Sequence, residues 1–249
     1  MQKGKRLRFR RLGLFLICLD LAACAGDPQD RIGRIYTWKL RPTDKNVERI
    51  RACLEDPDRD VRAMALHALI SLGIEDGQAI SLEALRDEDG FVRATAARCL
   101  GEMGVAVAAP ALAERLSSDP DWHVRKLAAE SLTVLGGTEA AEALVRALED
   151  PVRGVRLAAV SGAGELSPDA AFEILAGIVL EDPDWEVRVH AARAIGRSSR
   201  PETAATLEAA RNDPNEFVRA AATAALRSAG RVPGSPGPVS LGGPAPPGS

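Results

Sequence analysis

The sequence has 249 residues, of which 46% are hydrophobic and only 4% aromatic, and its formal net charge is −3. This composition is typical of a globular protein with ample length for a core. Abundant alanine and leucine with few aromatic rings favour closely packed helices over a sheet. The negative charge argues against a general nucleic-acid surface, which needs clustered lysine and arginine, and we expect no nucleic-acid partner.

The first 23 residues follow the pattern of a secretory signal. A basic block lies within residues 3–11, the short apolar run "LGLFLICL" occupies residues 12–19, and "LAAC" ends at Cys24. A basic n-region, a short h-region and small residues before a cleavage site are the parts of such a signal. The run is far shorter than the roughly 20 residues of a membrane-spanning helix. We therefore predict a signal peptide over residues 1–23.

The "LAAC" motif resembles the lipobox of bacterial lipoproteins, although Asp20 is an unfavourable charge just before it. The resemblance implies that Cys24 is the lipid attachment site and that a lipid anchor holds the chain on a membrane of the bacterial cell envelope. Because Ala25 rather than aspartate follows the cysteine, the outer membrane is favoured. The alternative is a cytosolic protein with a chance cysteine. Without residues 1–23 the chain has 26 basic and 34 acidic residues, a net charge of −8.

Two further segments differ from the rest in composition. Residues 24–42 are predicted to be a tether whose second half, around Tyr36 and Trp38, is more apolar. Residues 231–249 hold six prolines and five glycines and have almost nothing to bury, so we expect a disordered tail. The central residues 43–230 carry an internal repeat.

The repeat is evident from residues that recur every 31 or 32 positions. An aspartate opens each copy, valine always stands five residues later, arginine six later and alanine nine later. Periods of this size indicate a solenoid. The opening aspartates are Asp56, Asp87, Asp119, Asp150, Asp182 and Asp213. The arginines are Arg62, Arg93, Arg125, Arg156, Arg188 and Arg219.

Each copy is interpreted as helix–turn–helix. Proline after the aspartate ends the first helix in five copies, and repeat two has Glu88 instead. The predicted N-cap of the second helix, two residues past the aspartate, is polar except for Val152 in repeat four. The polar caps are Asp58, Asp89, Asp121, Asp184 and Asn215. Valine and alanine then share the buried face of the second helix.

The unit "DPDWHVRKLAAESL" at residues 119–132 and its five counterparts resemble the HEAT repeat in its short, PBS-lyase HEAT-like form. This resemblance implies an all-α, right-handed α-solenoid of six short HEAT-like helix–turn–helix repeats over residues 43–230. It also implies that the six aspartates and six arginines form a structural ladder of charge-assisted hydrogen bonds between stacked repeats. The alternative for the arginine row is an anion-binding surface.

Residues suited to metal or nucleophilic chemistry are few. His67, His123 and His190 stand at three different positions of the repeat, so no metal site and no cofactor is expected. Cys53 and Cys99 occupy core positions and are predicted to be buried thiols, with a disulfide as the alternative. HEAT-like hydroxylases hold a di-iron centre through His-Glu pairs, and this sequence has no His-Glu dipeptide.

Aromatic residues mark the turn edge of the repeats. Trp122 and Trp185 stand three residues past their aspartates, and Phe91, His123 and Phe217 stand four past theirs. They are either interface anchors or covers for the neighbouring helix. We therefore expect a non-catalytic protein–protein interaction scaffold with an unidentified protein partner. The alternative is an enzyme or enzyme accessory related to HEAT-like bilin lyases or hydroxylases, which fold analogy alone supports.

Overall fold

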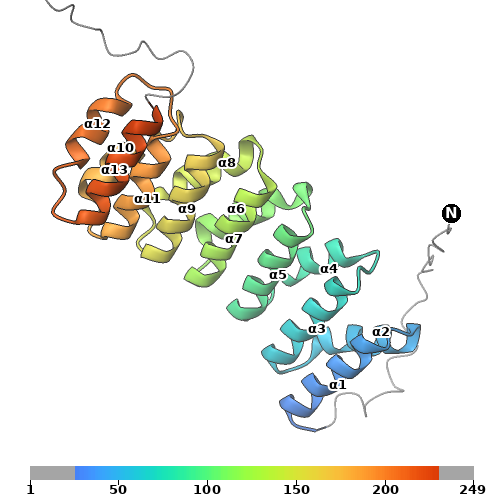
Figure 1. The fold of residues 1–249 in the computed structure, drawn as a ribbon. Coiled ribbons are helices and arrows are strands. Elements are labelled where there is room, and N and C mark those ends of the chain that lie inside the picture. Colours follow the sequence, from blue (N-terminus) through green and yellow to red (C-terminus); the bar gives the residue numbers. More distant parts are fainter. Residues whose placement is uncertain (1–25, 230–249) are drawn as a thin grey trace, which may run out of the picture. The chain divides into compact units, whose positions relative to one another are not determined.

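A computed structural model describes residues 26–229 of the chain. The described residues are all-helical, with no strand, and the architecture is that of an α-solenoid (Figure 1). The chain divides into two compact units with a boundary between Ile74 and Glu75. The predicted signal peptide, the lipid site Cys24 and the tail over residues 231–249 lie outside the described part.

Unit 1 contains three α-helices within its described residues. They are α1 (Pro28–Leu40), α2 (Asp44–Ala52), which a 3₁₀ turn (Cys53–Glu55) extends, and α3 (Arg59–Ser71). Helix α1 packs against both α2 and α3. Helices α2 and α3 form the first of the six predicted repeats.

Helix α1 lies in the segment that the sequence analysis assigns to a tether. The side chain of Asp27 caps it by accepting a 2.9 Å hydrogen bond from the Asp30 N–H, and Pro28 stands in the first turn. Ile35 and Arg31 are buried. Arg31 lies 31 residues before Arg62, which is the period of the repeats. Helix α1 therefore packs within unit 1 at the place of a second helix, whereas the sequence analysis predicts a tether here.

Unit 2 contains the other five repeats, each a pair of antiparallel helices. Its helices are α4 (Gly77–Ala84), α5 (Gly90–Glu102), α6 (Ala109–Ser118), α7 (Trp122–Leu135), α8 (Thr138–Arg146), α9 (Arg153–Leu166), α10 (Phe172–Glu181), α11 (Trp185–Ile195), α12 (Thr203–Ala210) and α13 (Glu216–Ala229). Short 3₁₀ turns precede α6 (Ala106–Ala108) and follow α8 (Ala147–Glu149). None of the described helices has the length and apolar character needed to cross a membrane.

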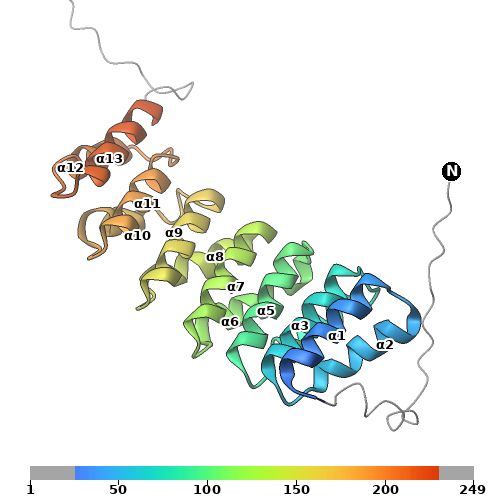
Figure 2. The same ribbon diagram turned by 60° about the horizontal axis from the view of Figure 1, so that its bottom comes forward.

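The helices of unit 2 form two layers. The second helices α5, α7, α9, α11 and α13 pack side by side in chain order, and each first helix packs on the second helix of its own repeat (Figure 2). The five polar N-caps each accept a hydrogen bond from a backbone N–H in the first turn of the second helix. Val152 offers no such cap, so α9 begins without one.

Small residues allow the second helices to approach closely. The alanine nine residues past each repeat aspartate is completely buried in all six repeats. Glycines also contribute: a Cβ added at Gly164 would lie 2.3 Å from the Cβ of Ala194, and one at Gly196 would lie 2.7 Å from the Cβ of Ala225. Real Cβ atoms do not approach so closely, so these contacts between neighbouring repeats require glycine.

At one shared position the first helices bury a large aliphatic residue, with an exception in repeat two. Ile50, Leu112, Leu144, Leu175 and Leu207 are all completely buried. The corresponding residue of α4 is Ser81, which is equally buried and whose hydroxyl has no hydrogen-bond partner among the described residues. A serine here fills less of the core and leaves a polar group unsatisfied, so α4 is held less firmly than its counterparts.

Candidate functional site

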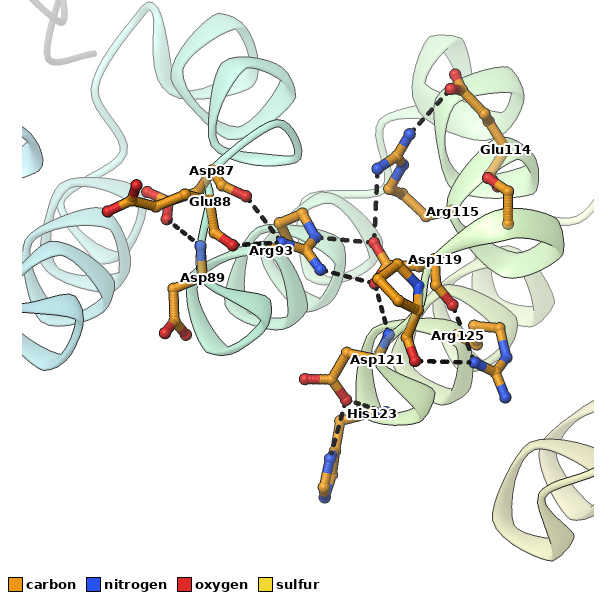
Figure 3. Close-up of polar contacts among 12 residues, drawn as sticks. Asp87, Glu88, Asp89, Arg93, Glu114, Arg115, Asp119, Asp121, His123 and Arg125 are labelled. Carbon is orange, nitrogen blue, oxygen red and sulfur yellow. Dashed lines mark hydrogen bonds and ion pairs between the residues drawn. The ribbon is translucent and has the colours of Figure 1, made fainter.

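The repeat arginines make two kinds of contact, which Arg93 illustrates (Figure 3). Its Nη1 donates to the backbone carbonyls of Asp87, at 2.8 Å, and Glu88, at 3.0 Å, in its own repeat. Its Nε and Nη2 donate to the two carboxylate oxygens of Asp119 in the next repeat, both at 2.8 Å. One guanidinium thus fixes its own turn and binds the following repeat through a bidentate pair.

The same arrangement recurs through unit 2. Three further arginines bind the aspartate of the following repeat through Nε and Nη2 at 2.7 to 3.1 Å: Arg125 with Asp150, Arg156 with Asp182, and Arg188 with Asp213. In unit 1, Arg31 of α1 binds Asp56, with its Nε 3.0 Å from Oδ2 and its Nη2 3.1 Å from Oδ1. Arg62 anchors its own turn by donating to the carbonyls of Asp56 and Pro57.

Each repeat aspartate also closes its own turn. Its Oδ1 accepts a hydrogen bond from the backbone N–H two residues later, as Asp119 does from Asp121 at 3.0 Å. The same bond occurs in the other five repeats at 2.7 to 2.9 Å. The aspartates therefore connect the turn and the neighbouring repeat.

The electrostatics favour the charged form of these pairs. Burial alone would raise the pKa of Asp119, but hydrogen bonds from Arg93 and from the Asp121 N–H outweigh it and hold that pKa below its ordinary value. Arg188 similarly lowers the pKa of Asp213. The hydrogen bonds to their aspartates raise the pKa of Arg93, Arg125 and Arg188. Arginines that are engaged in this way are not available to bind an external anion.

Four aromatic side chains, which we call the aromatic edge, remain partly exposed at the starts of second helices in unit 2. They are Phe91, 50% exposed, Trp122, 38%, Trp185, 38%, and Phe217, 55%. The ring of Trp122 stacks on His123 with centroids 3.6 Å apart. The aromatic edge therefore has ring faces in contact with solvent.

The two tryptophans also contact the following repeat. A Cβ added at Gly154 would lie 3.3 Å from the ring of Trp122, so Trp122 covers the start of α9. Trp185 lies against Phe217 with ring centroids 5.2 Å apart. Arg153, between them in the repeat order, pairs with Asp184 at 2.6 Å and with Glu186. The covering role given in the sequence analysis thus has a structural basis, and the interface role stays a prediction.

The remaining candidate residues lie apart from one another. His67 is on α3, His123 on α7 and His190 on α11, where the hydroxyl of Ser161 lies 3.1 Å from its Nδ1. Burial and Arg193 lower the pKa of His190. Within residues 26–229 no three histidine, cysteine or acidic side chains are placed to hold a metal ion. Cys53 and Cys99 are both buried thiols, and the Sγ of Cys53 lies 3.3 Å from the carbonyl oxygen of Arg49. Burial raises the pKa of Cys99 to about 11.

The sequence analysis did not single out Arg31 or Asp169. Asp169 precedes α10 and accepts hydrogen bonds from the Ser198 hydroxyl at 2.6 Å, from the Ser199 hydroxyl at 2.7 Å and from the Ser199 N–H at 2.8 Å. These bonds lower its pKa. For Asp169 the signal was Ser199, which stands after the second helix of repeat five where repeats one to three have Gly73, Gly104 and Gly136. For Arg31 the signal was its spacing of 31 residues from Arg62.

The arrangement of repeats is matched by one family model and by solved structures. A model described as HEAT repeats matches residues 47–133, 81–163, 109–184 and 141–227. The chain therefore belongs to the HEAT-repeat family. No curated protein sequence matches it.

Solved structures similar to this chain include one with a TM-score above 0.5. This engineered protein is 22% identical over 74% of this chain and 96% of its own, with a TM-score of 0.52, and at this identity it shows the fold alone. The complex of CpcE and CpcF of phycocyanin lyase from Nostoc sp. is 23% identical over 90% of this chain and 91% of that chain, with a TM-score of 0.48. Human deoxyhypusine hydroxylase is 19% identical over 83% of this chain and 92% of that chain, with a TM-score of 0.44.

Proposed function

We propose that the chain is a non-catalytic protein-binding scaffold and that the aromatic edge is its binding surface. The observation that carries the proposal is the partial exposure of four large rings on one edge of unit 2. Aromatic side chains are enriched among the residues that dominate binding at protein interfaces, because they bury a large area with few rotatable bonds.

The ladder supports this function by limiting the motion of the edge. Each ring stands at or next to the first residue of a second helix, and the turn before that helix is fixed by the aspartate and arginine of its repeat. A rigid surface loses little conformational entropy on binding. Stacked repeats also give an extended surface that suits a protein partner better than a small molecule.

A comparison of variants on the same helix tests the binding surface. Trp122→Ala combined with Trp185→Ala should abolish the co-purification of partner proteins from the source cells. Val134→Ala is the matched control, because Val134 lies near the other end of α7 and is 71% exposed. Circular dichroism verifies that both variants are folded. Partners retained by the double variant, or lost equally with Val134→Ala, would refute the assignment.

We also propose that lipid on Cys24 anchors the scaffold to the bacterial cell envelope, most simply at the outer membrane. The support is the sequence before Cys24, which has the parts of a lipoprotein signal. More than one acyl chain on Cys24 would anchor it stably, whereas a single chain binds marginally. Labelled palmitate should enter the native chain and not Cys24→Ser. Unlabelled, soluble protein with residues 1–23 intact would contradict the anchor.

The non-catalytic assignment has its own test. Purified protein should contain no stoichiometric metal and show no visible absorption band. A bound metal or pigment at one equivalent per chain would instead favour an enzyme or enzyme accessory related to the hydroxylases or bilin lyases.

A further inference from the structure

The last arginine of the ladder, Arg219, is oriented like the others but has no carboxylate to bind. Its Nη1 donates to the carbonyls of Asp213 at 2.8 Å and Pro214 at 2.9 Å, as Arg93 does in its own turn. In the four complete pairs of unit 2, Nε and Nη2 of such an arginine hold the next repeat's aspartate. Within residues 26–229, exposed Arg219 forms no ion pair.

The first half of α13 presents exposed surface beside Arg219 within the described residues. Ala220 is exposed, whereas its counterparts Ala63, Ala94 and Val189 are buried. Farther along, Arg227 stands where three earlier repeats have glycine at a close helix contact, as at Gly196, and where the other two have Ile70 and Thr133.

We propose that Arg219 binds the side-chain carboxylate of an aspartate in a turn of a partner protein. This proposal rests on the protein-binding function proposed above and names one chemical group that the partner contributes. The guanidinium is already held at the angle that binds a carboxylate bidentately in the other repeats, so little entropy is lost on binding.

The chain itself offers no evident ligand for this position. Residues 230–249 contain neither aspartate nor glutamate. A second copy stacked end to end would present the residue 31 positions before Asp56, which is Ala25. We therefore assign the aspartate to a partner protein. A turn that begins Asp-Pro, like residues 119 and 120, has the right chemistry, because its carboxylate also accepts the backbone N–H two residues later.

The test measures binding of a peptide that copies residues 119–122. Acetyl-Asp-Pro-Asp-Trp-amide is titrated into the full chain while the Nε–H resonance of Arg219 is followed by NMR. The expected result is a weak shift that increases with peptide concentration, because one exposed ion pair contributes only about 0–1 kcal/mol. A peptide with asparagine in first position should not shift the resonance. Arg219→Lys, for which the indole N–H resonance of the peptide is followed instead, should bind the peptide more weakly, because lysine keeps the charge but loses the planar fork.

Matched variants separate this site from general charge attraction and from the aromatic edge. Arg227→Lys changes an exposed arginine of the same helix and should leave the affinity unchanged. Equal weakening in both arginine variants, or equal binding of the asparagine peptide, would overturn the proposal. Self-association that sedimentation detects and Arg219→Lys abolishes would assign the site to a second copy instead. Trp122→Ala should not alter peptide binding. Failure of the proposal for the aromatic edge and failure of the proposal for Arg219 therefore give different results.

Discussion

Replacement of Arg93 by alanine should destabilise the protein strongly. The carboxylate of Asp119 is completely buried, and the Arg93 side chain is 10% exposed. Without Arg93, Asp119 keeps the N–H of Asp121 and the guanidinium of Arg115, which is 3.5 Å away. Leaving one partner of a buried ion pair without the other costs about 3–5 kcal/mol. Because Arg115 compensates in part, we expect a loss of about 3 kcal/mol, the lower end of that range.

Urea and thermal unfolding followed by circular dichroism measure this loss. A loss of about 3 kcal/mol corresponds to a fall of about 6–12 °C in the melting temperature of a chain of this size. Arg219→Ala is the matched control, because Arg219 makes the same carbonyl contacts without a carboxylate and should cost less than about 1 kcal/mol. If Arg93→Ala and Arg219→Ala lowered stability equally, the carboxylate pairing would not be the source of the stability.

Three further changes test other parts of the structure. Gly164→Ala should lower the free energy of unfolding by about 1–3 kcal/mol, because its Cβ would meet that of Ala194 at 2.3 Å. Gly177→Ala, in α10 with nothing within 4 Å, should instead raise it by up to about 1 kcal/mol, and equal effects in urea melts would contradict the packing argument. The pKa of Asp119 is lower in the folded protein than in the unfolded chain. The ionised carboxylate therefore stabilises the folded protein fully above the pKa of the unfolded chain, near 4, and this stabilisation is lost as the pH falls through the pKa of the folded protein. The urea midpoint should therefore decline below about pH 4, and an unchanged midpoint would exclude this linkage. Cys99, with a pKa of about 11 and buried, should resist a thiol reagent at pH 8 until the protein is unfolded, whereas rapid labelling of the native protein would show that it is accessible.

The repeat could be located from the sequence because the corresponding residues of every copy pack against equivalent neighbours. Valine and alanine recur at buried positions of the second helices, and the N-cap residues recur where helices begin, so six copies stand in register. Helix α1 does not follow this pattern. It packs on α2 and α3, but Asp30 and Arg34 occupy the positions at which the six repeats have valine and alanine. Only Asp27 and Arg31 keep the spacing.

The surface was harder to predict than the core, because exposure depends on residues in a different repeat. Trp122 spreads over the start of α9 since residue 154 is glycine, whereas Trp185 meets the ring of Phe217 at the equivalent place. Nothing in the local sequence around either tryptophan distinguishes the two cases.

The single serine in the core of α4 has a consequence for how unit 2 opens. In a stack of repeats that contact mainly their neighbours, the free energy of unfolding is close to a sum of contributions from the individual repeats. The part with the smallest contribution therefore opens first. Because Ser81 stands where the other first helices have leucine or isoleucine, α4 at the start of unit 2 lacks the stabilisation that burial of such a side chain gives. We expect its amide protons to exchange with solvent fastest among the first helices, because α4 detaches while α6 to α13 stay folded. Local opening of the stack would then begin at α4.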